Sequence, residues 1–193
     1  SNTRVFFEAL SAIDSIGYIC DCWGLDSAYY GCLQSRPRAW IVGYRKDLKV
    51  SPTKPKQTSK PKAIGEIFPH VKFMFMPQFQ GLLLPNTKPL PTITKTPNLF
   101  FIYDGTKVPK LSPSALKSLQ FDEELIKQMS EKPNDHYMKL PTIGELMVLS
   151  GVRKNYIFPG DSYIKKWNRL GNMVLPDQMK TLVEHIKKEL SLV

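Results

Sequence analysis

Three polar side chains at alternate positions, Gln34, Arg36 and Arg38, stand directly before an apolar run in the sequence. A guanidinium group carries fixed N–H donors that match the oxygen atoms of a carbonyl or a phosphate group. These residue types could hold a polar or anionic ligand beside a strand, although the spacing alone is a weak signal. The alternative is a polar strand entrance whose arginines pair with surface acids.

A second candidate binding element is Gly171-Asn172-Met173, which precedes the last helical pattern of the chain. A glycine permits close approach of its backbone to a ligand, and an asparagine amide both donates and accepts hydrogen bonds. The alternative is a plain turn before a capped helix.

Positive charge is the strongest signal in the composition, with a formal net charge of +10 and a pI near 9.5. Such a balance favours a polyanionic partner through phosphate contacts. The densest basic run, residues 45 to 62, is rich in proline, which argues against the amphipathic helix of a membrane surface. The alternative is a solvated loop that contacts nothing. The candidate nucleic-acid-binding residues are Arg45, Lys46, Lys54, Lys56, Lys60 and Lys62.

The three cysteines and three histidines form no metal-ligand or nucleophile motif, so we expect reduced thiols and no metal site. No apolar run reaches the roughly 20 residues that cross a bilayer, and the N-terminus lacks the order of a secretory signal. We therefore expect a cytoplasmic protein without a membrane partner.

Hydrophobic spacing predicts the elements that must position these residues. Residues 5 to 16 have a helical pattern that ends at Gly17. Two strands follow at residues 18–23 and 38–44, and the apolar run of the second predicts burial on both faces, as in an α/β sheet. Residues 45–62 are expected to be a mobile linker and residues 64–104 a β-rich unit. Helices are expected at residues 112–131, at residues 142–150 with a capping box of Thr142 and Glu145, and from an N-cap at Asp177 onward.

Three blocks, in order, resemble the second half of the cytosine-5 DNA methyltransferase family. Gln34-Ser35-Arg36-Pro37-Arg38 is similar to the family's Gln-x-Arg-x-Arg block. Lys139-Leu140-Pro141-Thr142-Ile143-Gly144-Glu145 resembles its Arg-x-Leu-Thr-x-x-Glu helix, with lysine in place of arginine. Gly171-Asn172-Met173-Val174-Leu175-Pro176 resembles its Gly-Asn-(Ala/Ser)-Val-x-Pro signature, with methionine in place of a small residue.

The resemblance implies a role for each block. Gln34, Arg36 and Arg38 would hold a flipped cytosine and a nearby phosphate in the catalytic pocket. Gly171, Asn172 and Met173 would help to bind S-adenosylmethionine, and double-stranded DNA would be the partner. The implied activity is DNA methylation of the kind found in restriction-modification systems.

The implied fold class is α/β. Edge strands and the C-terminal helix of a methyltransferase sheet are joined to a small β-rich target-recognition domain. The expected division is residues 1–48 for the last strands of the catalytic domain, residues 49–138 for the basic linker and recognition domain, and residues 139–193 for the return to the catalytic domain.

The family's attacking thiol, in a Pro-Cys-Gln loop, has no counterpart in this sequence. Its Glu-Asn-Val block and its glycine-rich cofactor loop are absent as well, and in the family all three precede the Gln-x-Arg-x-Arg block. We therefore expect an inactive chain that needs the N-terminal methyltransferase half, from the same polypeptide or from a separate subunit. The alternative is a non-enzymatic DNA-binding remnant or subunit.

Overall fold

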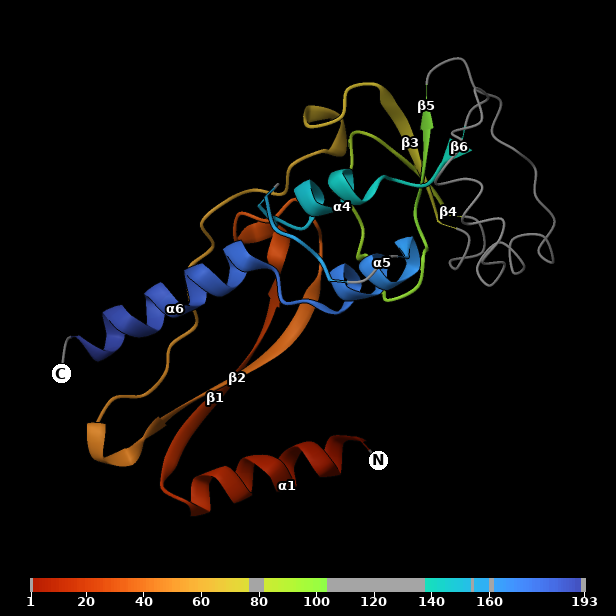
Figure 1. Cartoon of the computed structure of the whole chain (residues 1–193). Helices are drawn as coiled ribbons and strands as arrows, with labels where there is room; N and C mark the ends of the chain where they lie inside the picture. Colours follow the sequence, from red (N-terminus) through yellow and green to blue (C-terminus); the bar gives the residue numbers. More distant parts are fainter. Residues whose placement is uncertain (1, 77–81, 104–137, 154, 160–161, 192–193) are drawn as a thin grey trace.

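The computed structural model describes residues 2–76, 82–103, 138–153, 155–159 and 162–191 (Figure 1). The helix expected at residues 112–131 lies outside this part of the chain. The fold is mixed α/β, with a two-stranded sheet and a four-stranded sheet.

Helix α1 (Asn2–Ser15) ends where the sequence predicts. Gly17 takes a φ of 92°, a conformation that side-chain-bearing residues rarely adopt, and its N–H bonds to the carbonyl of Asp14 at 3.1 Å. In the described part of the chain, α1 packs mainly against the strand that follows it.

Strands β1 (Tyr18–Asp26) and β2 (Pro37–Arg45) form a long antiparallel hairpin in which Trp23 faces Trp40. The expectation that the second strand is buried on both faces is wrong. Val42 and Tyr44 are buried, whereas Ile41, the residue before Val42, is 43% exposed and Gly43 between them is exposed. The reason is that α6 (Pro176–Leu190) packs against one face of the hairpin, so burial follows the two-residue period of a strand.

The β-rich unit expected from residue 64 onward is present as a four-stranded sheet of order β4-β3-β5-β6. Its strands pair antiparallel throughout. Short 3-10 helices at Ser27–Tyr29, Lys46–Leu48 and Ile64–Glu66 connect the elements. The strands are β3 (Val71–Met76), β4 (Leu82–Pro85), β5 (Phe100–Tyr103) and β6 (Met138–Lys139).

Helix α4 (Ile143–Leu149) confirms the predicted capping box. The Thr142 hydroxyl accepts from the Glu145 N–H at 3.2 Å, and the Glu145 carboxylate accepts from the Thr142 N–H at 2.7 Å. Helix α5 (Tyr163–Asn172) was not predicted. The Gly171-Asn172 pair therefore lies in the last turn of a helix rather than in a plain turn.

The last helix, α6, begins differently from the prediction. Its N-cap is Leu175, Pro176 takes the first helical position, and Asp177 lies in the first turn. Proline suits this position because its missing N–H would have no helical partner there. Along this helix Leu182 is buried, whereas Met179, Val183 and Leu190 are between 37% and 40% exposed.

Two hydrophobic clusters hold these elements. The larger one joins the four-stranded sheet to α4 and α5, with Phe100, Leu146 and Trp167 among its fully buried members. The smaller one lies between the hairpin and α6.

Candidate functional site: an arginine-lined cavity

Asp26, at the end of β1, organises the segment that carries the candidate clamp. One carboxylate oxygen accepts from the backbone N–H of Arg36 at 2.9 Å and of Ala28 at 3.1 Å. The other accepts from the Ser35 hydroxyl at 2.7 Å. This turn fixes the backbone before β2 begins at Pro37, and no motif in the sequence pointed to Asp26.

Arg36 is only 8% exposed and joins three distant segments. Its guanidinium donates to the carbonyl of Ile93 at 2.9 Å and to the carbonyl of Gly171 at 2.8 Å. A longer contact of 3.4 Å reaches Oε1 of Gln34, which is fully buried. Burial lowers the pKa of Arg36, and the charge of Arg38 adds to this effect. Arg36 is thus fixed by the protein itself, and Gln34 supports it.

The backbone of Gly171 lies against the backbone of Thr94. A Cβ atom at residue 171 would be 2.1 Å from the Thr94 carbonyl oxygen. The same oxygen accepts from the indole N–H of Trp167 at 3.0 Å. Gly171 therefore allows its helix to pack closely against residues 91–95 of the same chain. Gly171 itself does not line the neighbouring cavity.

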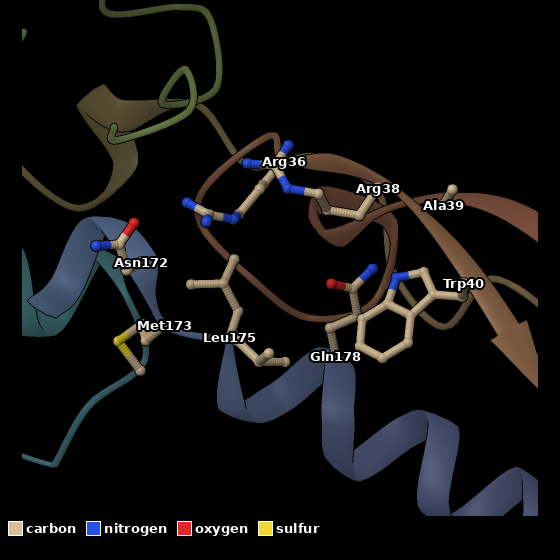
Figure 2. Close-up of a pocket in the computed structure, with 9 residues that line it drawn as sticks. Arg36, Arg38, Ala39, Trp40, Asn172, Met173, Leu175 and Gln178 are labelled. Carbon is tan, nitrogen blue, oxygen red and sulfur yellow. The ribbon is translucent and has the colours of Figure 1, made fainter. Parts of the chain in front are cut away.

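A cavity of about 310 Å³ opens beside Arg36 between the hairpin and the start of α6 (Figure 2). Arg38 is exposed there, and among the described residues its side chain donates only to the carbonyl of Pro37, its neighbour in β2, at 2.7 Å. The Asn172 side chain faces the same space and donates to Asn168 at 3.0 Å. We call this space the arginine cavity. Its lining residues are Arg36, Arg38, Ala39, Trp40, Asn172, Met173, Val174, Leu175 and Gln178.

The arginine cavity is a donor-rich, positively charged space. Two of its nine lining residues are arginines, and none is acidic. Such a lining attracts an anion or a group rich in acceptors. Arg36, Arg38, Asn172 and Met173 were singled out in the sequence, whereas Trp40 and Gln178 were not, because they belong to no motif.

A sequence profile of C-5 cytosine-specific DNA methylases matches residues 1–188 of the chain. The chain belongs to this family. Among curated protein sequences, none matches the chain.

Solved structures support the same fold. A triple mutant of DNMT2 from Spodoptera frugiperda matches with a TM-score of 0.57 and 16% identity, over 97% of this chain and 62% of that one. The methyltransferase EhMeth from Entamoeba histolytica matches with a TM-score of 0.54 and 14% identity, over 96% of this chain and 58% of that one. The chain therefore spans about three fifths of the length of these methyltransferases.

In this member of the family, residues 49–62 form an extended basic segment that runs along the body of the protein. In this segment Pro52 and Pro55 are buried, whereas Lys54 and Lys56 are exposed. Every third residue from Pro52 to Pro61 is a proline except Thr58. The period matches three residues per turn of an extended proline-rich chain, which places its lysines toward solvent.

Hydrogen bonds anchor the basic segment, for which the sequence predicts a mobile linker, at several points. The Thr53 N–H donates to the Glu189 carboxylate of α6 at 3.0 Å, and the Thr53 carbonyl contacts Nε2 of His185 at 2.7 Å. The Tyr30 hydroxyl donates to the Pro55 carbonyl at 3.1 Å. The Thr58 N–H donates to the carbonyl of Tyr29 at 3.0 Å. Lys54, Lys56, Lys60 and Lys62 are therefore exposed on an anchored backbone.

Arg45 and Lys46 differ from the four lysines of the basic segment. Arg45 forms an ion pair with Asp47, and Lys46 one with Asp14 at 2.8 Å. Both pairs are exposed and lie at the end of β2 near α1. Their positive charges are partly compensated by these local acids.

Cys32 is buried and free. Burial raises the pKa of its thiol to about 11, and the charges of Asp177 and Asp26 add to the rise. A thiol with such a pKa is protonated near pH 7 and is a poor nucleophile. None of the three cysteines lines the arginine cavity.

Among the described residues, no group of three or more His, Cys, Asp or Glu side chains is arranged to hold a metal ion. Among the helices of the same residues, none has the length and apolar character needed to cross a membrane.

Proposed function

We propose that this chain is the C-terminal portion of a DNA (cytosine-5-)-methyltransferase. It supplies DNA recognition, a clamp for the flipped cytosine and its phosphate, and part of the cofactor pocket, while the attacking thiol comes from a part of the enzyme outside this chain. The observation that carries the proposal is that the Gln-x-Arg-x-Arg and Gly-Asn blocks, more than 130 residues apart, meet at one cavity that contains no thiol.

Arg38 is the residue that we assign to ligand contact, and Arg36 is assigned to positioning. The guanidinium of Arg36 already donates to two backbone carbonyls, whereas Arg38 is exposed at the cavity and, among the described residues, bonds only to its neighbour Pro37. A guanidinium that faces the cavity offers donors to the carbonyl of an extruded base or to a phosphate.

Asn172 and Met173 are assigned to S-adenosylmethionine, for which this chain supplies one wall. The arginine cavity of about 310 Å³ lies at the lower end of the roughly 300–1,000 Å³ of small-molecule pockets. Met173 also lines a second, open cavity of about 1230 Å³, so both spaces meet at this residue. The amide of Asn172 and the apolar side chain of Met173 fit a ligand with polar and apolar parts. When bound, the cofactor supplies the methyl group.

The partner half is expected to cover the apolar surface that this chain exposes. On α1, Val5 and Phe7 are more than 60% exposed, and on the hairpin Ile41 is 43% exposed. Apolar groups at such positions on two adjacent elements are typical of a surface that another part of a protein covers. The proposal therefore includes poor solubility or self-association of the chain on its own.

Double-stranded DNA is the proposed substrate, and the basic segment supplies phosphate contacts. Replacing Lys54, Lys56, Lys60 and Lys62 with glutamine should weaken duplex binding. Each lost phosphate contact should also reduce the slope of log affinity against log salt by about 0.9. Fluorescence anisotropy with a labelled duplex at several salt concentrations measures both effects.

The matched control for this experiment replaces four exposed lysines of the helices, Lys165, Lys180, Lys187 and Lys188, with glutamine. The control changes the net charge equally but leaves the basic segment intact, so its salt slope should stay close to that of the unmodified chain. An equal loss of slope in both variants would mean that total charge, rather than the basic segment, governs binding.

Arg38→Ala tests the clamp in a mixture of this chain with a polypeptide that carries the Pro-Cys-Gln and Glu-Asn-Val blocks. Loss of one positioned donor at the reacting base should lower turnover by about 100-fold. Transfer of a labelled methyl group into duplex DNA is the measurement, and Lys165→Ala, at an exposed position on α5, is the control. Unchanged turnover for Arg38→Ala would show that the pocket is assigned wrongly.

A further inference from the structure

Two buried N–H donors in the arginine cavity have no hydrogen-bond partner. They are Nε1 of Trp40, on β2, and Nε2 of Gln178, in the first turn of α6. Buried polar groups without a partner are uncommon because their desolvation is uncompensated. We propose that Trp40 and Gln178, beside Arg38, form a subsite that binds the anionic oxygen atoms of a ligand.

Trp40 stands apart from the other two tryptophans of the chain. The indole N–H of Trp23 donates to the Asp21 carboxylate at 2.7 Å, and that of Trp167 donates to the Thr94 carbonyl at 3.0 Å. The indole N–H of Trp40 is shielded from solvent and makes no such bond. An indole N–H only donates, so an acceptor from a ligand is what it lacks.

Gln178 supplies the second donor to the same cavity from α6, whereas Trp40 comes from β2 (Figure 2). Its side chain is 2% exposed. It lies in the first turn of the 15-residue helix α6, whose N-cap residue, Leu175, makes no side-chain capping bond. The free N–H groups and the dipole at a helix N-terminus favour a negative charge. Asp177 in the same turn opposes this effect only in part, since its side chain does not line the cavity.

The lining of the cavity defines the class of ligand. Arg36 and Arg38 bring positive charge, Trp40 and Gln178 bring N–H donors, and no lining residue is acidic. An oxyanion matches all four groups at once. Its source, which rests on the proposed function, is a phosphate of the DNA backbone or the carboxylate of the cofactor.

The test uses the full chain labelled with 15N and follows its three indole N–H resonances, which Trp40→Phe assigns. Inorganic phosphate is the first probe. Only the Trp40 resonance should move downfield, with saturation, while those of Trp23 and Trp167 stay in place because their donors are already bonded. Gln178→Met should weaken phosphate binding about 5- to 10-fold, and unchanged Trp23 and Trp167 resonances would show that this variant is folded.

Two further arms identify the source of the oxyanion. A shift of the Trp40 resonance with a short duplex assigns a DNA phosphate, and a shift with S-adenosylhomocysteine assigns the cofactor carboxylate. The inference is overturned if the Trp40 resonance moves with none of the three probes, or if Gln178→Met leaves phosphate affinity unchanged. Failure of the proposed function is distinct, since the chain would then bind neither duplex nor S-adenosylhomocysteine while inorganic phosphate still shifted the Trp40 resonance.

Discussion

Gly171→Ala should destabilise the chain by about 3 kcal/mol or more, the upper range for a forced backbone shift in a packed interior. The added Cβ would lie 2.1 Å from the Thr94 carbonyl oxygen and 2.8 Å from the Lys95 nitrogen. Both are backbone atoms, so no side-chain rotation relieves the contact. The shift would also disturb the bond between Trp167 and Thr94 and the bond between Arg36 and Gly171.

Urea unfolding followed by circular dichroism measures this effect, and Gly144→Ala is the matched control. Gly144 is exposed in α4, and the nearest atom to a Cβ there is 3.9 Å away. Alanine favours a helix over glycine by about 0.5–1 kcal/mol, so the control should be unchanged or slightly more stable. Similar stability for the two variants would contradict the tight packing of α5 on Thr94.

Arg36→Met should lower the free energy of unfolding by about 2–4 kcal/mol, since hydrogen bonds from a charged group are worth about 1.5–3 kcal/mol each and buried carbonyls would lose their donor. The carbonyls of Ile93 and Gly171 are the two that lose a partner. Arg38→Met should stay within about 0.5 kcal/mol of the unmodified chain, as expected for an exposed side chain.

The contrast between the two arginines is itself the test, because their substitutions remove the same charge from neighbouring positions. Thermal unfolding of both variants at one pH and one salt concentration measures it. Equal destabilisation would mean that Arg38 is also a structural residue, and the assignment of Arg38 to ligand contact would then lose its basis.

Local signals in the sequence predicted local structure well. Gly17 ends α1, and Thr142 with Glu145 begins α4, because both signals depend on neighbouring residues only. Helix α5 was missed although Tyr163, Trp167 and Leu170 follow helical spacing, because Gly171-Asn172 was interpreted as a turn. Pattern analysis applied to residues 163–172 would have found it.

Long-range contacts explain the remaining differences. The apolar run of β2 does not reveal how many elements cover the strand, so burial on both faces was predicted for a hairpin that α6 covers on one. Arg36 and Arg38 look equivalent in the sequence. Their difference arises from Ile93 and Gly171, which are distant along the chain. Trp40 and Gln178 reach the cavity for the same reason.

Methyl transfer by the purified chain is the measurement that bears most directly on this account. We predict no incorporation of label from S-adenosylmethionine into duplex DNA by the chain alone, since none of its cysteines lines the arginine cavity and Cys32 is held protonated. Adding a polypeptide with the Pro-Cys-Gln and Glu-Asn-Val blocks should produce incorporation. Turnover by the chain alone, or none in the mixture, would contradict the claim that the clamp and the thiol belong to separate parts of one enzyme.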